Sequence, residues 1–188
     1  MSEQQWELSL TVQSAEETHA LGAALGGVLE AGDLVILTGE LGAGKTTFTQ
    51  GLGEGLGVRA GIISPTFVLV RIHPNLPDGP RPGGPDLVHV DAYRLETAAE
   101  IDDIDLENTL DSTVTVVEWG RGRVEHLSDS LLDVELHRPL RPSPDAAGGV
   151  LDFDTDDDDD EPRTIVIRGF GPRWAEQPLL PAALKGNS

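Results

Sequence analysis

The sequence is poor in residues on which several classes of protein depend. It contains no cysteine, so neither disulfide bonds nor thiolate metal sites can form. Lysine and arginine together number 13 against 33 aspartates and glutamates, and only Lys45 and Lys185 are lysines. The formal net charge of −20 argues against an autonomous nucleic-acid-binding protein, because contacts with phosphates need clustered basic side chains.

Long apolar runs are also missing. None approaches the roughly 20 residues that a membrane-spanning helix needs, and the N-terminus lacks a basic segment followed by an apolar one. We therefore expect a cytoplasmic protein with no membrane segment. With 188 residues, 38% of them hydrophobic, the chain can bury one core, and we predict a single domain spanning residues 1–188.

Two segments have compositions that disfavour regular structure. Residues 74–86 are rich in proline and glycine, which predicts an extended, flexible hairpin loop. Residues 141–162 hold nine acidic side chains and one arginine, and the run of aspartates at 156–160 predicts a disordered acidic insert. Because this insert carries −8 of the net charge of −20, the rest of the chain, at −12, is acidic as well.

What the sequence does contain is a glycine-rich loop with the spacing of a phosphate-binding motif. Residues 39–46 read Gly-Glu-Leu-Gly-Ala-Gly-Lys-Thr, which fits the pattern G-x-x-x-x-G-K-[ST]. In that pattern backbone N–H groups surround a polyphosphate, the lysine reaches the β- and γ-phosphates, and the hydroxyl binds Mg²⁺. Lys45 and Thr46 are the candidates for these two roles.

The residues around this loop have the expected context. Residues 34–37 are apolar and read as a short buried strand, while Phe48, Leu52 and Leu56 recur at helical spacing after the loop. The phosphates would then lie at the positive N-terminus of the helix. A chance glycine-rich turn is the alternative, which the flanking strand and helix disfavour.

Two further strand-like runs end in carboxylates. Residues 87–90 lead into Asp91, and residues 113–117 lead into Glu118. The carboxyl ends of strands form the ligand-binding edge of an α/β sheet. Either side chain could hold Mg²⁺, directly or through water, or orient an attacking water. Each could also be an ordinary carboxylate in the turn that ends a strand.

Two other positions are candidates for nucleotide contact. Ser64 and Thr66 precede a strand-like run and could form a switch segment beside the γ-phosphate, although Ser-Pro-Thr is also a common turn. Trp119 directly follows Glu118 and is either a core aromatic or a nucleotide contact. The Asn-Lys-x-Asp motif that reads guanine is absent, so adenine is the favoured base.

The order of predicted elements favours one fold class. A capping box at Ser14 and Glu17 predicts the start of a first helix, which is followed by a strand, the phosphate loop, a second helix and then mainly strands. This order predicts a three-layer α/β fold of the P-loop NTPase type with few helices. Its central sheet would be mixed, with parallel strands near the nucleotide and antiparallel strands toward the end.

Four blocks of sequence, taken together and in order, resemble the TsaE (YjeE) family of bacterial ATPases. The blocks are 39–47 (GELGAGKTT), 64–67 (SPTF), 91–95 (DAYRL) and 117–119 (VEW). The resemblance covers about residues 4–174 apart from the two inserts. The phosphate loop alone is unspecific, whereas the combination is highly specific. Val68, Ala92 and Gly120 depart from the family pattern.

The resemblance implies a cytoplasmic, Mg²⁺-dependent ATPase that acts in the biosynthesis of tRNA threonylcarbamoyladenosine. In the family, TsaC makes threonylcarbamoyl-adenylate, and the adenosine beside the anticodon is modified in tRNAs that read codons beginning with A. TsaE does not transfer the carbamoyl group; its ATP binding and hydrolysis let the TsaB–TsaD complex turn over repeatedly. The implied partners are therefore TsaB and TsaD, with tRNA reached only indirectly through them.

The resemblance also implies roles for individual residues. Lys45, Asp91 and Glu118 would be catalytic, and Thr46 and Glu118 would bind Mg²⁺. Contacts with ATP would come from the loop, the switch segment and their neighbours, namely Thr18, Leu41, Gly42, Ala43, Gly44, Lys45, Thr46, Thr47, Ser64, Thr66 and Trp119. Whether Asp91 or Glu118 orients the attacking water stays open.

Two alternative functions use the same loop. A small-molecule kinase would usually carry an arginine-rich lid, but only Arg121 and Arg123 cluster here. A nucleotide-gated adaptor would bind ATP as a switch without significant hydrolysis. Because Arg94, Arg121 or a partner would have to supply an arginine finger, we expect hydrolysis by the isolated protein to be slow.

Overall fold

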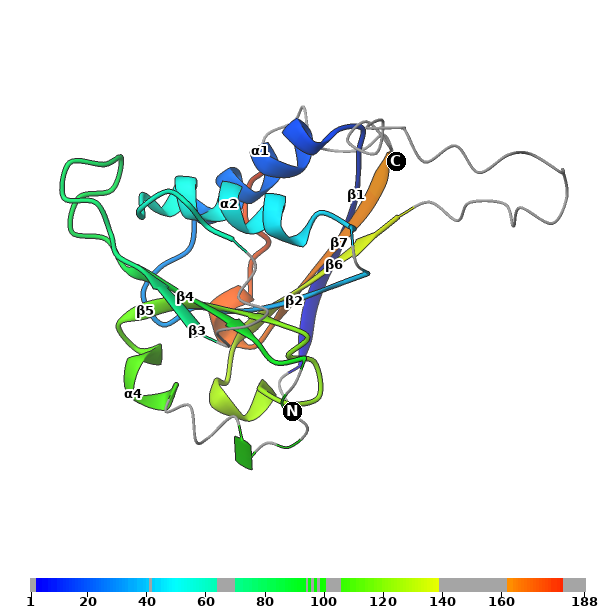
Figure 1. Ribbon diagram of the computed structural model, residues 1–188. Helices are drawn as coiled ribbons and strands as arrows, with labels where there is room; N and C mark the ends of the chain where they lie inside the picture. Colours follow the sequence, from blue (N-terminus) through cyan, green and yellow to red (C-terminus); the bar gives the residue numbers. More distant parts are fainter. Residues whose placement is uncertain are drawn as a thin grey trace, which may run out of the picture.

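The computed structural model describes residues 3–40, 42–63, 70–93, 95, 97, 99–100, 106–138 and 162–180. These residues form a mixed seven-stranded sheet in the order β1-β7-β6-β2-β5-β4-β3 (Figure 1). The strands are β1 Gln4–Val12, β2 Leu34–Gly39, β3 Val70–His73, β4 Asp86–Asp91, β5 Thr113–Glu118, β6 Leu131–His137 and β7 Arg163–Phe170. The helices are α1 Ala15–Gly26, α2 Lys45–Leu56 and α4 Glu107–Leu110, with 3₁₀ turns η1 Glu125–Leu127 and η4 Pro172–Trp174.

Parallel pairing is concentrated in the middle of the sheet. Strand β2 lies between β5 and β6 and is parallel to both, and β4 continues the parallel set beyond β5. Antiparallel pairs join β7 to β6 and to β1, and β3 to β4. The predicted mixed α/β sheet is therefore confirmed. All six residues of β5 are buried, as expected for a parallel strand covered on both faces.

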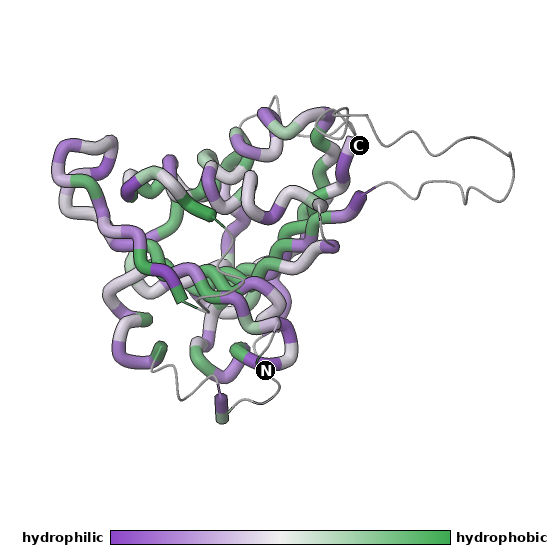
Figure 2. The backbone as a smooth tube through the Cα atoms, viewed as in Figure 1, coloured by the Kyte–Doolittle hydropathy of each residue, from purple (hydrophilic) through white to green (hydrophobic). Residues whose placement is uncertain are grey.

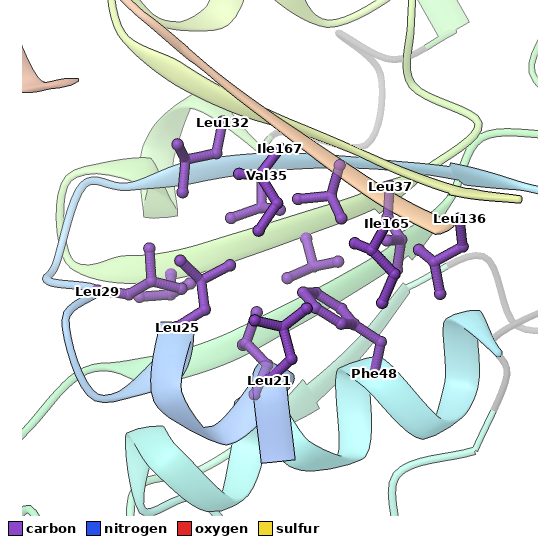
Figure 3. Close-up of a cluster of buried hydrophobic side chains, with 14 of the residues drawn as sticks. Leu21, Leu25, Leu29, Val35, Leu37, Phe48, Leu132, Leu136, Ile165 and Ile167 are labelled. Atoms are coloured by element: carbon purple, nitrogen blue, oxygen red, sulfur yellow. The ribbon is translucent and has the colours of Figure 1, made fainter. Parts of the chain in front are cut away.

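Helices and loops cover the two faces of the sheet. Helices α1 and α2 lie on one face, and α4 lies on the other (Figure 1). Figure 3 shows Leu21, Leu25 and Phe48 of the helices pointing at Val35 and Leu37 of β2, and each of these side chains is fully buried. A second apolar cluster on the opposite face joins β2, β4 and β5 to α4 and η1. Figure 2 shows the hydrophobic residues following the strands between these layers.

The contact between α1 and α2 depends on glycine. At four glycines an ideal β-carbon would lie 2.0–2.2 Å from a carbonyl oxygen of the other helix. These are Gly22 and Gly26 of α1 and Gly51 and Gly55 of α2. No side chain fits at such distances, so the glycines allow the two backbones to touch. Each glycine weakens its own helix in isolation by about 1 kcal/mol relative to alanine, and the close packing of the two helices offsets that loss.

The first helix begins as its sequence predicts. The Ser14 hydroxyl accepts a hydrogen bond from the backbone N–H of Glu17 at 3.2 Å. The Glu17 carboxylate in turn accepts from the backbone N–H of Gln13 at 2.6 Å, one residue before the position that a standard capping box uses. The cap fixes where α1 starts, and thereby where its face meets α2.

The proline- and glycine-rich segment is more compact than its composition predicts. The Arg81 guanidinium donates hydrogen bonds to the carbonyl of Gly26 (3.0 Å), the last residue of α1, and to the carbonyl of Leu29 (2.8 Å), just beyond the helix. Asn75 Nδ2 donates to the Arg81 carbonyl at 3.0 Å. The segment connects the antiparallel strands β3 and β4, as expected for a hairpin loop, and polar side chains between the prolines tie its turns to the helix layer. Its flexibility stays a prediction, and the acidic insert lies outside the described residues except for Pro162.

Candidate nucleotide-binding site

The loop between β2 and α2 has the backbone that its glycines allow. Gly42 and Gly44 have φ values of 77° and 99°, in the left-handed region that favours glycine. Gly44 is also the N-cap of α2, where no side chain caps the helix and no acidic residue lies in the first turn. The first N–H groups of α2 and its positive dipole end are thus open to an anion. Leu41 lies outside the described residues.

Lys45 lies within this loop. Its Nζ donates to the carbonyls of Gly39 at 2.6 Å and Glu40 at 3.1 Å, and lies 5.0 Å from the centre of the Trp119 ring. Burial lowers the pKa of the Lys45 ammonium, while the charges of Glu118 and Asp91 act in the opposite direction. The ammonium is held by carbonyl dipoles, which a phosphate could replace.

The two predicted carboxylates meet at one edge of the sheet. Asp91 and Glu118 end the neighbouring parallel strands β4 and β5, are directly paired in register, and are 5% and 3% exposed. Leu37 of β2, two residues before the loop, is paired with Glu118 on the other side. The predicted juxtaposition of phosphate loop and carboxylates is therefore confirmed as geometry.

Each carboxylate has a specific hydrogen bond. Asp91 Oδ1 accepts from the backbone N–H of Tyr93 at 2.9 Å, an Asx-type turn that ends β4. Glu118 Oε1 lies 3.1 Å from Nε2 of the buried His89. Asp91 thus has a structural role in its turn, and its role toward Mg²⁺ or the attacking water stays a prediction.

Trp119 has an unusual backbone conformation. It has a φ of 59°, which makes it the one residue other than glycine with a positive φ in the part of the chain that the structure describes. Such a conformation costs on the order of 1–3 kcal/mol and is concentrated at functional sites. Its backbone N–H donates to the Leu37 carbonyl at 3.0 Å. Its half-buried ring packs edge-on against the Tyr93 ring, with 5.7 Å between the ring centroids. The indole therefore lies beside Lys45 and outside both hydrophobic clusters.

Two arginines beside the loop were missed from the sequence. An ideal β-carbon on Gly42 would lie 3.1 Å from Arg138 Nη1, and one on Gly44 would lie 3.0 Å from Arg163 Nη1. Arg138 directly follows β6, and Arg163, 6% exposed, begins β7. They come from either side of the acidic insert and form no motif. The signal that could have indicated them was the general scarcity of cations.

The arginine-finger candidates from the sequence are placed differently. Arg121 pairs with Asp133 at 2.5 Å and with Glu135, both on β6. Its guanidinium is therefore engaged in an ion-pair network on that strand. Arg94 lies outside the described residues, as do Ser64 and Thr66 of the predicted switch segment.

Thr18 lies on the first helix close to the phosphate loop, and its contact with ATP stays a prediction. It is buried on α1, and its Cγ2 would lie 3.5 Å from a β-carbon on Gly44. Its hydroxyl donates to the Ser14 carbonyl at 3.3 Å. The glycine-mediated contact between α1 and α2 is what brings this side chain to the loop.

Oxygen donors suitable for Mg²⁺ are present at the same edge. Thr46 is the second residue of α2, and Glu118 ends the strand next to β2. The described residues hold no cluster of three or more His, Cys, Asp or Glu side chains that could bind a metal. Mg²⁺ does not require one, because it is commonly held by one or two carboxylates together with phosphates and waters. The residues therefore fit Mg²⁺ bound together with a nucleotide.

A surface groove of about 530 Å³ lies elsewhere, at the C-terminal half of α2. Its lining includes His19, Glu54, Arg59 and Leu76 but no residue of the phosphate loop. Its size alone does not make it the nucleotide site, since the charged groups converge around the loop.

No described helix has the length and apolar character that crossing a membrane requires.

Comparisons with known proteins identify the family. The model of the family "Threonylcarbamoyl adenosine biosynthesis protein TsaE" matches residues 12–142. The tRNA threonylcarbamoyladenosine biosynthesis protein TsaE of Streptomyces coelicolor is 50% identical over 156 residues, covering 82% of this chain and 92% of that protein. The protein of the same name from Bacillus subtilis is 35% identical over 133 residues, covering 70% of this chain and 78% of that protein.

A solved structure has a similar fold. The crystal structure of Bacillus subtilis YdiB superposes with a TM-score of 0.63 at 26% identity, covering 93% of this chain and 90% of that one. The region matched by the family model contains the phosphate loop, Asp91 and Glu118. The chain therefore belongs to the TsaE family of tRNA threonylcarbamoyladenosine biosynthesis proteins.

Proposed function

We propose that this protein binds ATP together with Mg²⁺ and hydrolyses it slowly, and that this reaction drives the turnover of a TsaB–TsaD complex in tRNA modification. The observation that supports the proposal most strongly is the convergence of cationic groups on one loop. Lys45, Arg138, Arg163 and the N-terminus of α2 surround Gly42 and Gly44. In a chain of net charge −20, such a cluster favours a polyphosphate.

The proposed chemistry is electrostatic and positional. Lys45, with the neighbouring arginines, neutralises charge on the phosphates, and Mg²⁺ held by Thr46 and Glu118 would neutralise more of it. Asp91, beside Glu118 at the same strand ends, orients the attacking water or shares that role with Glu118. Trp119, whose ring lies next to the Lys45 ammonium, contacts the nucleotide beside that lysine.

Slow hydrolysis in isolation is part of the proposal. Arg121, one of the two arginine-finger candidates within this chain, is bound to Asp133 and Glu135. Docking of TsaB and TsaD is expected to complete the catalytic geometry, and tRNA is reached only through them. The acidic surface of the chain suits docking to a more basic protein, although it serves solubility equally well.

Calorimetry with ATP tests the binding step. Wild-type protein is expected to bind ATP more tightly with Mg²⁺ than in EDTA, and Lys45→Ala should abolish detectable binding. Arg59→Ala is the matched control, because it removes an exposed positive charge from the groove distant from the loop. Equal ATP affinity in wild type and Lys45→Ala would contradict the proposal.

Single-turnover phosphate release tests the hydrolysis step. Release should be slow from the protein alone, faster with TsaB and TsaD, and lost in Glu118→Ala, which should still bind ATP. ATP binding without release in either condition would favour a nucleotide-gated adaptor. Transfer of the γ-phosphate to a nucleoside or small metabolite in place of water would favour a kinase.

A further inference from the structure

A fully buried histidine lies within hydrogen-bonding distance of Glu118, the proposed magnesium ligand. His89 of β4 has a side chain 0% exposed, and its Nε2 lies 3.1 Å from Oε1 of Glu118, whose side chain is 4% exposed. The two residues are 29 positions apart in sequence and meet only because β4 and β5 are parallel neighbours. Neither composition nor motif spacing indicated this pair.

The register places the pair on the face of the sheet that carries the phosphate loop. His89 is paired with Val116, and Asp91 with Glu118, so His89 and Asp91 share one face of β4 while Val116 and Glu118 share one face of β5. Val116 belongs to the hydrophobic cluster under α1 and α2. The side chains of His89 and Glu118 therefore project from the same face, which α1 and α2 cover, and His89 lies two residues before the end of β4 that carries Asp91.

The surroundings of the two imidazole nitrogens of His89 favour one tautomer. Nδ1 of His89 is buried and has no hydrogen-bond partner among the described residues. A proton on Nδ1 would be an unsatisfied buried donor, which costs about 1–3 kcal/mol. The geometry therefore favours the tautomer that carries its proton on Nε2 and donates it to Glu118 Oε1.

We propose that His89 is a positioning residue for the metal-binding carboxylate. Its Nε2–H holds Oε1 of Glu118, which fixes the plane of the carboxylate and leaves the other oxygen for Mg²⁺ beside Thr46. The inference rests on the proposed Mg²⁺·ATP function and extends it to a residue that does not itself touch metal or nucleotide. Outer partners of metal-bound groups typically affect metal affinity by about 10- to 100-fold.

The test compares two substitutions of His89. His89→Leu removes the donor at similar volume, whereas the side-chain amide of His89→Gln can still donate to Oε1. His73→Leu is the matched control, because His73 is a buried histidine on the adjacent strand β3, without a partner for its Nε2 among the described residues. Thermal unfolding establishes that each variant is folded before binding is measured.

Calorimetric titrations separate nucleotide affinity from metal affinity. ATP is titrated in EDTA, and Mg²⁺ is then titrated into the protein saturated with ATP. We expect His89→Leu to bind ATP in EDTA within about twofold of wild type and Mg²⁺ about 10- to 100-fold more weakly. His89→Gln should recover part of that loss, and His73→Leu should match wild type.

A second readout needs neither metal nor nucleotide. Nitrogen-15 NMR of the ATP-free wild-type imidazole should show His89 protonated at Nε2 and unprotonated at Nδ1. This measurement keeps the inference testable if His89→Leu does not fold.

The outcomes distinguish this inference from the proposed function. Wild-type Mg²⁺ affinity in His89→Leu, or a His89 protonated only at Nδ1, would overturn the positioning role and leave the ATPase proposal standing. Wild-type protein whose ATP binding is indifferent to Mg²⁺ would overturn both.

Discussion

At the scale of single residues, the candidate site is shaped by which atoms are missing as much as by which are present. Gly44 has no β-carbon, and this leaves room for Arg163 Nη1 and Thr18 Cγ2 beside the loop. Gly42 does the same for Arg138. The left-handed φ of both glycines also turns the backbone N–H groups of the loop, which a residue with a side chain would do only with strain. The absence of a β-carbon at these two glycines therefore accounts both for the shape of the loop and for the room that Arg138 and Arg163 have beside it.

Gly44→Ala should damage the site more than it damages the fold. The substitution strains a φ of 99° and places a methyl group 3.0 Å from Arg163 Nη1, so we expect ATP affinity to fall by at least about tenfold, with a stability loss of about 1–2 kcal/mol. Calorimetry and urea unfolding measure the two effects.

Gly32→Ala is the control for Gly44→Ala. Gly32 has nearly the same φ, 96°, but nothing within 4 Å of its β-carbon position. It should lose comparable stability and keep wild-type ATP affinity. An equal loss of affinity in both variants would show that backbone strain alone is responsible.

At the scale of elements, the glycine contact between α1 and α2 connects packing to the site. Thr18 on α1 reaches the loop only because the two helices touch through backbone atoms. A helix-propensity argument counts each glycine of α2 as a defect. Packing reverses that judgement, because the same residues permit a closer approach than any other amino acid allows.

Gly51→Ala should therefore destabilise the protein, although alanine is the better helix former by about 1 kcal/mol. The new methyl group would lie 2.0 Å from the His19 carbonyl oxygen, so the helices must separate. We expect a net loss of about 2 kcal/mol or more in urea unfolding, and weaker ATP binding as Thr18 moves away from the loop.

Gly27→Ala is the matched control at the end of α1. Its β-carbon would have its nearest neighbours at 3.4 and 3.6 Å, which is ordinary contact, and its φ is −64°. Its stability should change by no more than about 0.5 kcal/mol. A similar loss in both variants would contradict the close-packing argument.

Strands β6 and β7 carry an ion-pair network that predicts a response to acid. Desolvation raises the pKa of Glu135, but hydrogen bonds from Arg168 and Arg121 outweigh it and lower the pKa from 4.5 to about 2. A carboxylate with a lowered folded-state pKa stabilises the protein above its unfolded value of 4.5. That contribution is lost progressively as the pH falls from 4.5 through about 2.

Glu135→Gln should thus be less stable than wild type at pH 7, by about 1 kcal/mol, with the difference shrinking toward zero as the pH approaches 2. Chemical unfolding at several pH values measures this convergence. Glu54→Gln controls for net charge, since Glu54 is exposed and pairs only with His19 among the described contacts. A difference between wild type and Glu135→Gln that does not change with pH would contradict the network argument.

At the scale of the whole molecule, the sheet order explains why distant segments meet at one edge. The loop follows β2, the carboxylates end β4 and β5, and Arg138 and Arg163 belong to the facing ends of β6 and β7. Because β6 and β7 are antiparallel neighbours, with His137 paired to Thr164, the two arginines stay close whatever the length of the chain between them.

Shortening the acidic connection should therefore spare the site. Replacing most of residues 139–162 by about eight glycine and serine residues should keep ATP affinity and raise stability by about 1 kcal/mol, because the loop closes with less loss of entropy. Calorimetry and thermal unfolding check both expectations. Loss of ATP binding would mean that the insert contributes to the site, and loss of TsaB–TsaD stimulation alone would give it a role in docking.

Local patterns predicted a large part of this protein. The capping box of α1, the strand before the loop and the carboxylates at two strand ends were read from short stretches of sequence, since each depends on neighbours within a few residues. Strand β1 was not predicted, although Trp6, Leu8, Leu10 and Val12 alternate with polar residues as a half-buried strand should. Its partner β7 lies at the other end of the chain, and only that pairing makes it part of the sheet.

The sequence by itself determined the family, the mixed α/β fold and the loop at which phosphates are expected to bind, because a contiguous motif carries its own geometry. Only the tertiary structure decided that Arg138 and Arg163 flank the loop, that His89 contacts Glu118, and that the glycines of α2 serve packing. The physical reason is that these contacts join residues from strands or helices that are adjacent in space and distant in the chain. No local pattern records which carbonyl, carboxylate or guanidinium a side chain will meet across a sheet.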